Sequence, residues 1–146
     1  MRLACSARIC QTWAMKPLCL IISLLSAAPA LAANGTMSAT EFDAYTKGKT
    51  VYYGSGGQPY GAAEYLPDRR VRWTFLDGQC QEGIWYEDDG LICFVYENQP
   101  DPQCWSFRRA TDGMVAQFEN DPGQTELYEV RKTEEPLVCP GPEVGV

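Results

Sequence analysis

From Thr50 onward, hydrophobic and polar residues alternate with a period of two, and turn-forming residues recur every eight to twelve positions. This pattern is typical of antiparallel strands joined by short loops. It predicts eight strands, at residues 50–54, 60–66, 70–76, 80–87, 91–96, 104–109, 114–119 and 126–132. We therefore predict an all-β fold, an antiparallel meander that forms either a small closed barrel or a strongly twisted open sheet.

A short helix is expected before the first strand. Ser38 can cap its first turn, Glu41 stands where a capping box requires it, and Gly48 can end it. Phe42 and Tyr45, three positions apart, give this helix one apolar side. The pattern predicts a short N-terminal helix that covers the sheet.

The turn residues also predict how the middle strands pair. If Asp89 and Gly90 form a two-residue hairpin turn, Trp85 lies opposite Phe94. Continuing this register through the next loop places Cys93 directly opposite Cys104, on the outer face. Directly opposed residues of a non-hydrogen-bonded pair have the short spacing that a disulfide needs.

Cys80 and Cys139 are then left to pair with each other, because the other pairings would require distant thiols to meet. Cys139 lies in a proline- and glycine-rich tail that has no periodicity and would otherwise fray. We therefore expect two disulfides on the outer face, one within a hairpin and one that holds the tail.

Two further loops complete the expected register. A three-residue loop at residues 77–79 places Gly83 opposite Trp73, and a turn at Asp112 and Gly113 places Phe107 opposite Phe118. The aromatic residues expected inside are Trp73, Trp85, Trp105, Phe75, Phe94, Phe107 and Phe118. They would leave little free volume in a closed barrel.

Residues 1–32 have the features of a signal peptide. The apolar run after Met15 ends in the small-x-small pattern Ala30-Leu31-Ala32, and it is too short to span a bilayer as a helix. Met15 is a better start than Met1, because the preceding residues make a poor signal. Residues 33–146 would then form a single exported domain, periplasmic or secreted, in a compartment where its four cysteines can oxidise.

Removal of this segment makes the chain strongly acidic. It takes away Arg2, Arg8 and Lys16 but no acidic residue, which leaves nine basic residues against 19 acidic ones and a net charge of −10. Such a surface repels nucleic-acid phosphates and anionic lipid head groups. We therefore expect no nucleic-acid partner and no membrane insertion of the exported domain.

Residues that could carry catalysis are few. The chain has no histidine, and the four cysteines of the domain have no C-x-x-C spacing, so we predict no metal site, no cofactor and no nucleophilic triad. Glu87, Asp88 and Asp89 are adjacent acids, as in paired-carboxylate hydrolases. Neighbouring strand residues face opposite ways, however, and the Asp89-Gly90 turn explains part of the cluster.

Tyrosines crowd the first hairpin, at Tyr52, Tyr53, Tyr60 and Tyr65. Because Tyr52 and Tyr53 are adjacent in a strand, some of these rings must face outward. Outward tyrosines can form a platform for a sugar or a protein, although strand tyrosines commonly just cover a half-buried sheet. They are the binding residues that the sequence suggests.

Several segments resemble a family of small exported, disulfide-containing β-rich proteins of unknown function from Gram-negative bacteria. The resemblance rests on Gly48-Lys49-Thr50-Val51, Arg70-Val71-Arg72-Trp73, Cys80-x-x-Gly83-x-Trp85-Tyr86, Ile92-Cys93-Phe94, Cys104-Trp105-x-Phe107 and Cys139-Pro140-Gly141-Pro142. It implies a β-rich exported domain and assigns no catalytic residue.

We therefore expect a non-enzymatic exported domain that binds a protein or a surface polymer. An acidic inhibitor of a cationic enzyme, such as a lysozyme, is the main alternative, because its surface charge suits such a partner. A hydrolase that uses the surface carboxylates near Glu87 is a third class.

Overall fold

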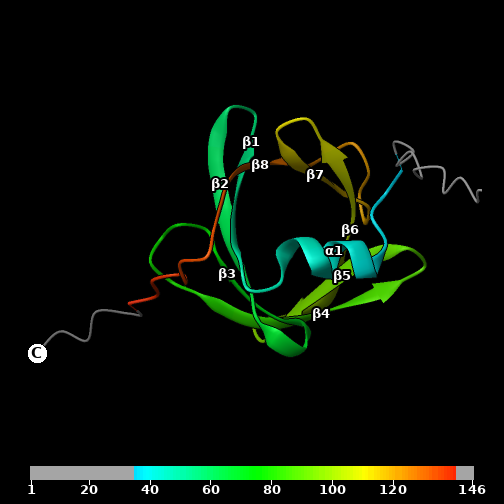
Figure 1. The fold of residues 1–146 in the computed structure, drawn as a ribbon. Helices are drawn as coiled ribbons and strands as arrows, with labels where there is room; N and C mark the ends of the chain where they lie inside the picture. The colour runs from blue at the N-terminus through cyan, green and yellow to red at the C-terminus, as the bar shows by residue number, and fades with distance from the viewer. Residues whose placement is uncertain (1–34, 141–146) are drawn as a thin grey trace, which may run out of the picture. The chain divides into compact units, whose positions relative to one another are not determined.

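The structure is a computed structural model that describes residues 35–140 (Figure 1). The expected signal segment, residues 1–32, with its suggested start at Met15, lies outside the described residues, as do residues 141–146. The elements are α1 (Ala39–Thr46), β1 (Thr50–Ser55), β2 (Gln58–Tyr65), the short 3-10 helix η1 (Pro67–Arg69), β3 (Arg70–Thr74), β4 (Gln81–Asp88), β5 (Leu91–Tyr96), β6 (Gln99–Ala110), β7 (Gly113–Phe118) and β8 (Glu126–Thr133). Within residues 35–140, no helix is long and apolar enough to cross a membrane.

The eight strands form a closed barrel in which each strand pairs antiparallel with its neighbours in sequence. The closure is made by β1 and β8, where Val51 lies opposite Lys132 and Tyr53 opposite Glu129. This pairing removes both free edges of the sheet, so no edge of unpaired backbone groups is left along the barrel. The predicted all-β fold is confirmed, and the closed form is the correct one of the two alternatives.

The predicted register of the middle strands is confirmed. Trp85 pairs with Phe94, and Cys93 pairs with Cys104. The β4–β5 turn has positive φ angles at both Asp89 (49°) and Gly90 (78°), which is the geometry of a type I′ turn. The turn residues therefore position these strands as the sequence indicated.

The predicted register of β3 and β4 is wrong by two residues. Gly83 lies opposite Val71 and not opposite Trp73, because β3 ends at Thr74 and a longer loop, residues 75–80, follows. The room for the Trp73 indole comes from Gly61, where any Cβ atom would overlap the ring. Phe75, expected inside, is instead 52% exposed in the loop.

The turn between β6 and β7 also differs from the expectation. Ala110 pairs with Gly113, so that Phe107 lies opposite Ala116 and not opposite Phe118. Gly113 has a φ angle of 130°, which residues with a side chain rarely adopt, and a Cβ there would also lie 2.9 Å from the Glu129 carboxyl carbon. A two-residue shift leaves the inward face unchanged, because the side-chain period of a strand is two.

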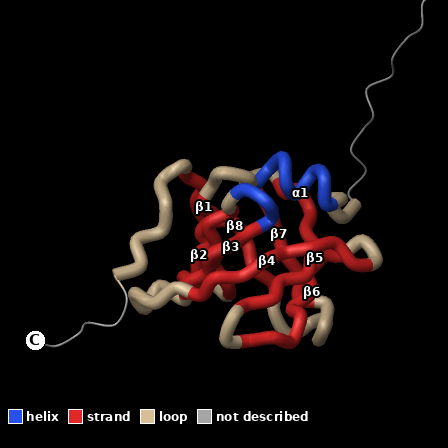
Figure 2. The backbone as a smooth tube through the Cα atoms, turned by 90° about the horizontal axis from the view of Figure 1, so that it is seen from below, coloured by secondary structure: helices blue, strands red, loops and turns tan. Residues whose placement is uncertain are grey.

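Helix α1 lies across one end of the barrel (Figures 1 and 2). Its capping box is present, with the Glu41 backbone donating to the Ser38 hydroxyl and the Ser38 backbone donating to the Glu41 carboxylate. Phe42 is fully buried and makes ring contacts with Trp85 and Phe107, at centroid distances of 5.1 and 4.5 Å. We call this the closed end, because Phe42 fills the interior there.

Side chains around the helix seal the closed end further. The Arg69 guanidinium lies over the ring of Trp85, which is buried. Tyr45 lies between Arg109 and Lys132, which both stack on its ring, and its hydroxyl donates to the Glu129 carboxylate at 2.5 Å. Burial and this hydrogen bond raise the pKa of Tyr45 to about 12.

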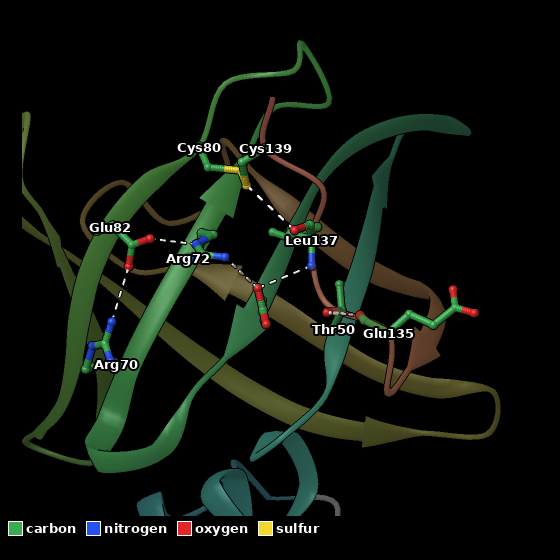
Figure 3. Close-up of polar contacts among 9 residues, drawn as sticks. Thr50, Arg70, Arg72, Cys80, Glu82, Glu135, Leu137 and Cys139 are labelled. Atoms are coloured by element: carbon green, nitrogen blue, oxygen red, sulfur yellow. Dashed lines mark hydrogen bonds and ion pairs between the residues drawn. A yellow bond between two sulfur atoms is a disulfide. The ribbon is translucent and has the colours of Figure 1, made fainter. Parts of the chain in front are cut away.

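Residues 134–140 form a strap that crosses the outer face of the barrel (Figure 3). The Thr50 hydroxyl donates to the Glu135 carbonyl at 2.7 Å, and the Leu137 backbone donates to the Glu64 carboxylate at 3.2 Å. Leu137 is buried beneath this contact. The strap is therefore held by β1 and β2 before it reaches its disulfide.

Both expected disulfides are present. Cys80 and Cys139 join the strap to the β3–β4 loop, with Cα atoms 5.6 Å apart. Cys93 and Cys104 link β5 to β6, with Cα atoms 4.0 Å apart. Cys93 has no exposed surface, yet it lies outside the core cluster that contains its neighbours Ile92 and Phe94, which agrees with the predicted outer face.

Candidate functional site

A cavity opens at the end of the barrel opposite α1. Its walls come from strand ends that meet there: the end of β1, the start of β2, the end of β3 and the start of β4, among others. The lining residues are Tyr53, Tyr60, Ala63, Tyr65, Trp73, Phe75, Gln81, Phe94, Tyr96, Gln99, Gln103, Trp105, Phe107, Ala116 and Leu127. We call this the open end of the barrel.

The cavity has a volume of about 60 Å³. A single water molecule needs roughly 10–15 Å³ of such space, and a pocket for a whole drug-sized ligand is on the order of 300 Å³ or more. The cavity therefore admits one inserted group of about the size of a side chain, while the rest of a ligand would lie on the rim.

The floor of the cavity is aromatic and uncharged. Tyr53 and Tyr65 are buried, and their hydroxyl groups share a hydrogen bond of 2.8 Å. Burial raises the pKa of Tyr53, Tyr65 and Tyr96 well above the ordinary value for tyrosine, so all three stay neutral at physiological pH. Because the two hydroxyl groups hydrogen-bond to each other, a group bound at the floor would make mainly apolar contacts and few hydrogen bonds.

The rim is made of large rings that are only partly covered. Trp73 contacts Tyr60 and Phe75, with ring centroids 6.1 and 5.4 Å apart. Phe75 and its neighbour Leu76 are 52% and 46% exposed. The open end thus presents apolar surface to solvent directly beside the cavity.

Three glutamines complete the lining: Gln81, Gln99 and Gln103. The Gln117 carboxamide, away from the cavity, donates to the carbonyls of Phe118 and Thr125. Within residues 35–140, the carboxamides of the three lining glutamines make no such intramolecular bond, and they remain able to donate and accept. They supply polarity to the cavity without charge.

The loops around the cavity are acidic. They contain Asp77 between β3 and β4, Glu97 between β5 and β6, and Glu119 and Asp121 between β7 and β8, while Asp101 lies near the start of β6. No lysine or arginine occurs in residues 56–57, 75–80, 97–103 or 119–125, which form this end of the described chain. An uncharged cavity is therefore surrounded by negative charge.

The loop that carries Phe75 is restrained by two hydrogen bonds and a disulfide. The Leu76 backbone donates to the Thr74 hydroxyl at 3.1 Å, and the Gln79 backbone donates to the Asp77 carboxylate at 3.0 Å. The disulfide at Cys80 fixes the end of the loop. A partner at the rim would accordingly meet a preformed surface.

The structure separates the four tyrosines that the sequence suggested. Tyr53 and Tyr65 form the cavity floor, and Tyr60 lies at its rim. Tyr52 faces outward and lies beneath Arg131, whose guanidinium is 4.1 Å from the ring centroid. The tyrosines are therefore not an outward platform: three of them belong to the cavity and one lies outside it.

The alternation of the sequence places Trp73, Trp105, Phe94 and Phe107 of the cavity inside the barrel but does not identify its other residues. The pattern predicts Phe75 inside the barrel and gives no signal for the three glutamines, because Gln81 begins β4 while Gln99 and Gln103 lie in β6, and only the folded barrel brings them to one cavity. The available signal is the apolar pair Phe75 and Leu76 directly before the turn residues Asp77 and Gly78.

The acidic residues Glu87, Asp88 and Asp89 are exposed at the β4–β5 hairpin. Strand β4 begins at the cavity with Gln81, so these acids lie at its far end, away from the cavity. Among the described residues, no group of three or more acidic or cysteine side chains is arranged to hold a metal ion.

A second depression lies on the outer face, over Gly83, beside Ile84 and Val95. Gly83 has no space for a side chain, because a Cβ would approach the Val95 carbonyl at 2.5 Å. Ile84 is 54% exposed, nearly the same fraction as Phe75. This depression is wider and more open than the cavity, with a volume of about 440 Å³, and Ile84 on its surface provides a matched control for Phe75 at the open end.

Comparisons with known proteins add no relative to this picture. No family model, no curated protein and no solved structure matches this chain.

Proposed function

We propose that this chain is an exported, non-enzymatic binding domain that takes a protein or a surface polymer at the open end of its barrel. The observation that carries the proposal is the cavity itself, a preformed and uncharged aromatic pocket whose rim exposes Phe75 and Leu76. Concave apolar sites with a few polar groups are the usual places where proteins bind ligands.

The contrast between the two ends supports this interpretation. An eight-stranded barrel is narrow enough for side chains to fill it, and Phe42 fills the closed end. At the open end, Trp73 and Trp105 are only partly buried, although both pack against the core. Large apolar groups left beside water reduce the stability gained by folding, which suggests that they are kept for another purpose.

The disulfides support the exported location. Disulfides persist in oxidising compartments and are rare in the cytosol, and the residues 35–140 contain two of them. The signal-like segment at residues 1–32 agrees with the same location.

The experiment compares a variant at the rim with its matched control. Purified protein is screened against neutral cell-wall oligosaccharides, soluble polysaccharides and basic proteins, and each binder is then tested against Phe75→Ala, Gln103→Trp and Ile84→Ala. We expect a genuine partner to lose at least about tenfold in affinity with Phe75→Ala or Gln103→Trp, as for residues at the centre of an interface. Ile84→Ala should leave the affinity unchanged.

The opposite pattern would contradict the site. If a partner binds all three variants with the affinity of the original chain but fails to bind Tyr52→Ala, the outward tyrosine and not the cavity is the binding surface. Circular dichroism of each variant checks the fold, which we expect to be intact because Phe75, Ile84, Tyr52 and Gln103 are all partly exposed.

A second candidate is an inhibitor of a cationic enzyme. The acidic loops at the open end favour it, because charge complementarity speeds association with a basic partner. We expect such an inhibitor to bind a lysozyme and lower its activity at low salt, and to lose this effect as the salt concentration rises. Absence of binding at low salt would remove this candidate.

A further inference from the structure

We infer that the group bound in the cavity is a bulky apolar side chain of a partner protein, flanked on that partner by lysine or arginine. This inference rests on the proposed function and names the partner class for the same site. It follows from the size of the cavity, the absence of charge in its lining and the charge of the loops around it.

The lining excludes a charged group inside the cavity. All 15 lining residues are uncharged, and nine of them are aromatic. A carboxylate or phosphate inserted among them would lose its hydration and find no cation to replace it, so it would bind far more weakly than an apolar group. An aromatic or large aliphatic group, by contrast, would gain contact with Trp73 and Trp105 as it leaves water.

The charges of the surrounding loops determine what can lie beside that group. The acids of the open end make no ion pair within residues 35–140, where the paired carboxylates are those of Glu64, Glu82, Glu126 and Glu134. Arg72 and Arg108, which extend from β3 and β6, are occupied by Glu82 and Glu126. The five acids of the open end are therefore uncompensated.

This arrangement matches a protein better than a neutral polymer. Interfaces between proteins have an apolar centre rich in Tyr, Trp and Phe and a polar rim, which is the arrangement of the cavity and its acidic loops. A neutral sugar would gain nothing from the negative charges, and an anionic one would be repelled. Basic side chains beside the inserted group would meet Asp101, which is exposed near the start of β6, and Glu97, which is exposed in the β5–β6 turn and also borders the depression over Gly83.

The test uses short peptides as probes. Three pentapeptides have tryptophan at the centre and lysine, glycine or glutamate at both ends, and a fourth has lysine at the ends and alanine at the centre. Binding is followed through the backbone amide NMR shifts of residues around the cavity, in particular Phe75, Gln81, Gln99 and Gln103. A neutral oligomer of N-acetylglucosamine serves as the polymer probe.

We expect the lysine-flanked tryptophan peptide to perturb these amides and to bind roughly fivefold more tightly than the glycine-flanked one, as for two exposed charge pairs. The alanine and glutamate peptides should bind more weakly than either. The advantage of lysine should shrink as salt rises, since exposed charges are screened over about 8 Å at physiological ionic strength.

A pair of matched charge variants localises the effect. Glu97→Gln with Asp101→Asn, at the open end, should bring the affinity for the lysine peptide down to that for the glycine peptide. Glu87→Gln with Asp112→Asn removes the same charge from exposed positions at the closed end and should leave the difference between the peptides in place.

Three results would overturn the inference, and they separate it from the proposed function. Equal binding of the lysine and glycine peptides at these amides would refute the basic partner while leaving the cavity as the binding site. Perturbation by the sugar oligomer and by no peptide would show that the occupant is a polymer. If no probe shifts the cavity amides, the inference and the proposed function both fail.

Discussion

The two ends of the barrel differ in whether a side chain fills the interior. At the closed end, Phe42 of α1 is fully buried against Trp85 and Phe107, and Arg69 covers the indole from outside. At the open end, Trp73 and Phe75 surround a cavity and remain partly in water. The aromatic residues of the closed end are buried, and similar residues at the open end remain partly exposed.

The charges of the two ends differ less than their packing. The closed end carries bases and acids together, with Arg109 and Lys132 stacked on Tyr45 and with Glu87, Asp88 and Asp89 at the β4–β5 hairpin, whereas the loops of the open end carry acids and no base. A difference in charge between two surfaces of one small domain says which surface suits which partner, independently of the fold. The following predictions test this division, beginning with the largest expected effect.

Alkaline pH should unfold the protein by way of its buried tyrosines. Burial raises the pKa of Tyr53, Tyr65 and Tyr96 above the value of about 10 in the unfolded chain. Their contribution to stability is then complete below pH 10 and is lost as the pH rises above it, at about 1 kcal/mol per pH unit for each tyrosine that keeps its proton. Denaturant titrations between pH 8 and 12 measure this slope.

The control for the alkaline prediction is Tyr96→Phe, which removes one such group from the cavity wall and should make the slope shallower. Tyr45 at the closed end should show its own titration at a pKa of about 12 by tyrosinate absorbance. A stability that stays constant to pH 12 would contradict the buried, neutral state of the cavity floor.

Truncating Phe42 at the closed end and Phe75 at the open end should show that the first contributes much more to stability than the second. Phe42→Ala removes a fully buried ring and should lower the free energy of unfolding by about 3–5 kcal/mol. Phe75→Ala removes a ring that is 52% exposed and should cost less than about 1 kcal/mol. Equal losses in urea denaturation would mean that the open end is as much a part of the core as the closed end.

Removing each disulfide in turn should show which of the two contributes more to the free energy of unfolding. Cys80 and Cys139 are 59 residues apart in sequence, and Cys93 and Cys104 are 11 apart. On the loop-entropy argument, Cys80→Ser with Cys139→Ser should cost about 4 kcal/mol, and Cys93→Ser with Cys104→Ser about 3. Thermal or denaturant unfolding of the two double variants measures the difference, and a larger loss for the hairpin disulfide would contradict the ranking.

The loss of the helix cap should have the smallest effect. Ser38→Ala removes the hydroxyl that accepts the Glu41 backbone bond and should destabilise the protein by about 1 kcal/mol. Because the cap lies at the closed end, binding at the open end should not change. A loss of binding without a comparable loss of stability would show that the helix and the cavity are coupled.

The sequence alone predicted the strands and much of the cavity floor, but not the cavity. Tyr53, Tyr60 and Tyr65 belong to one hairpin, so their proximity was visible in the sequence. Phe75 was misplaced because β3 was expected to run two residues too far, past Thr74. Gln99 and Gln103 gave no signal, because neutral polar residues at a strand start fit a solvent-facing position equally well.

Local alternation determined which side chains share a face and which cysteines pair. A strand repeats every two residues, so even the two-residue errors between β3 and β4 and between β6 and β7 left the inward set on the same side. The tertiary structure alone decided that the sheet closes, that Phe42 fills one end and that the other stays open. These features depend on contacts between segments far apart in the chain, whose relative positions no local pattern specifies.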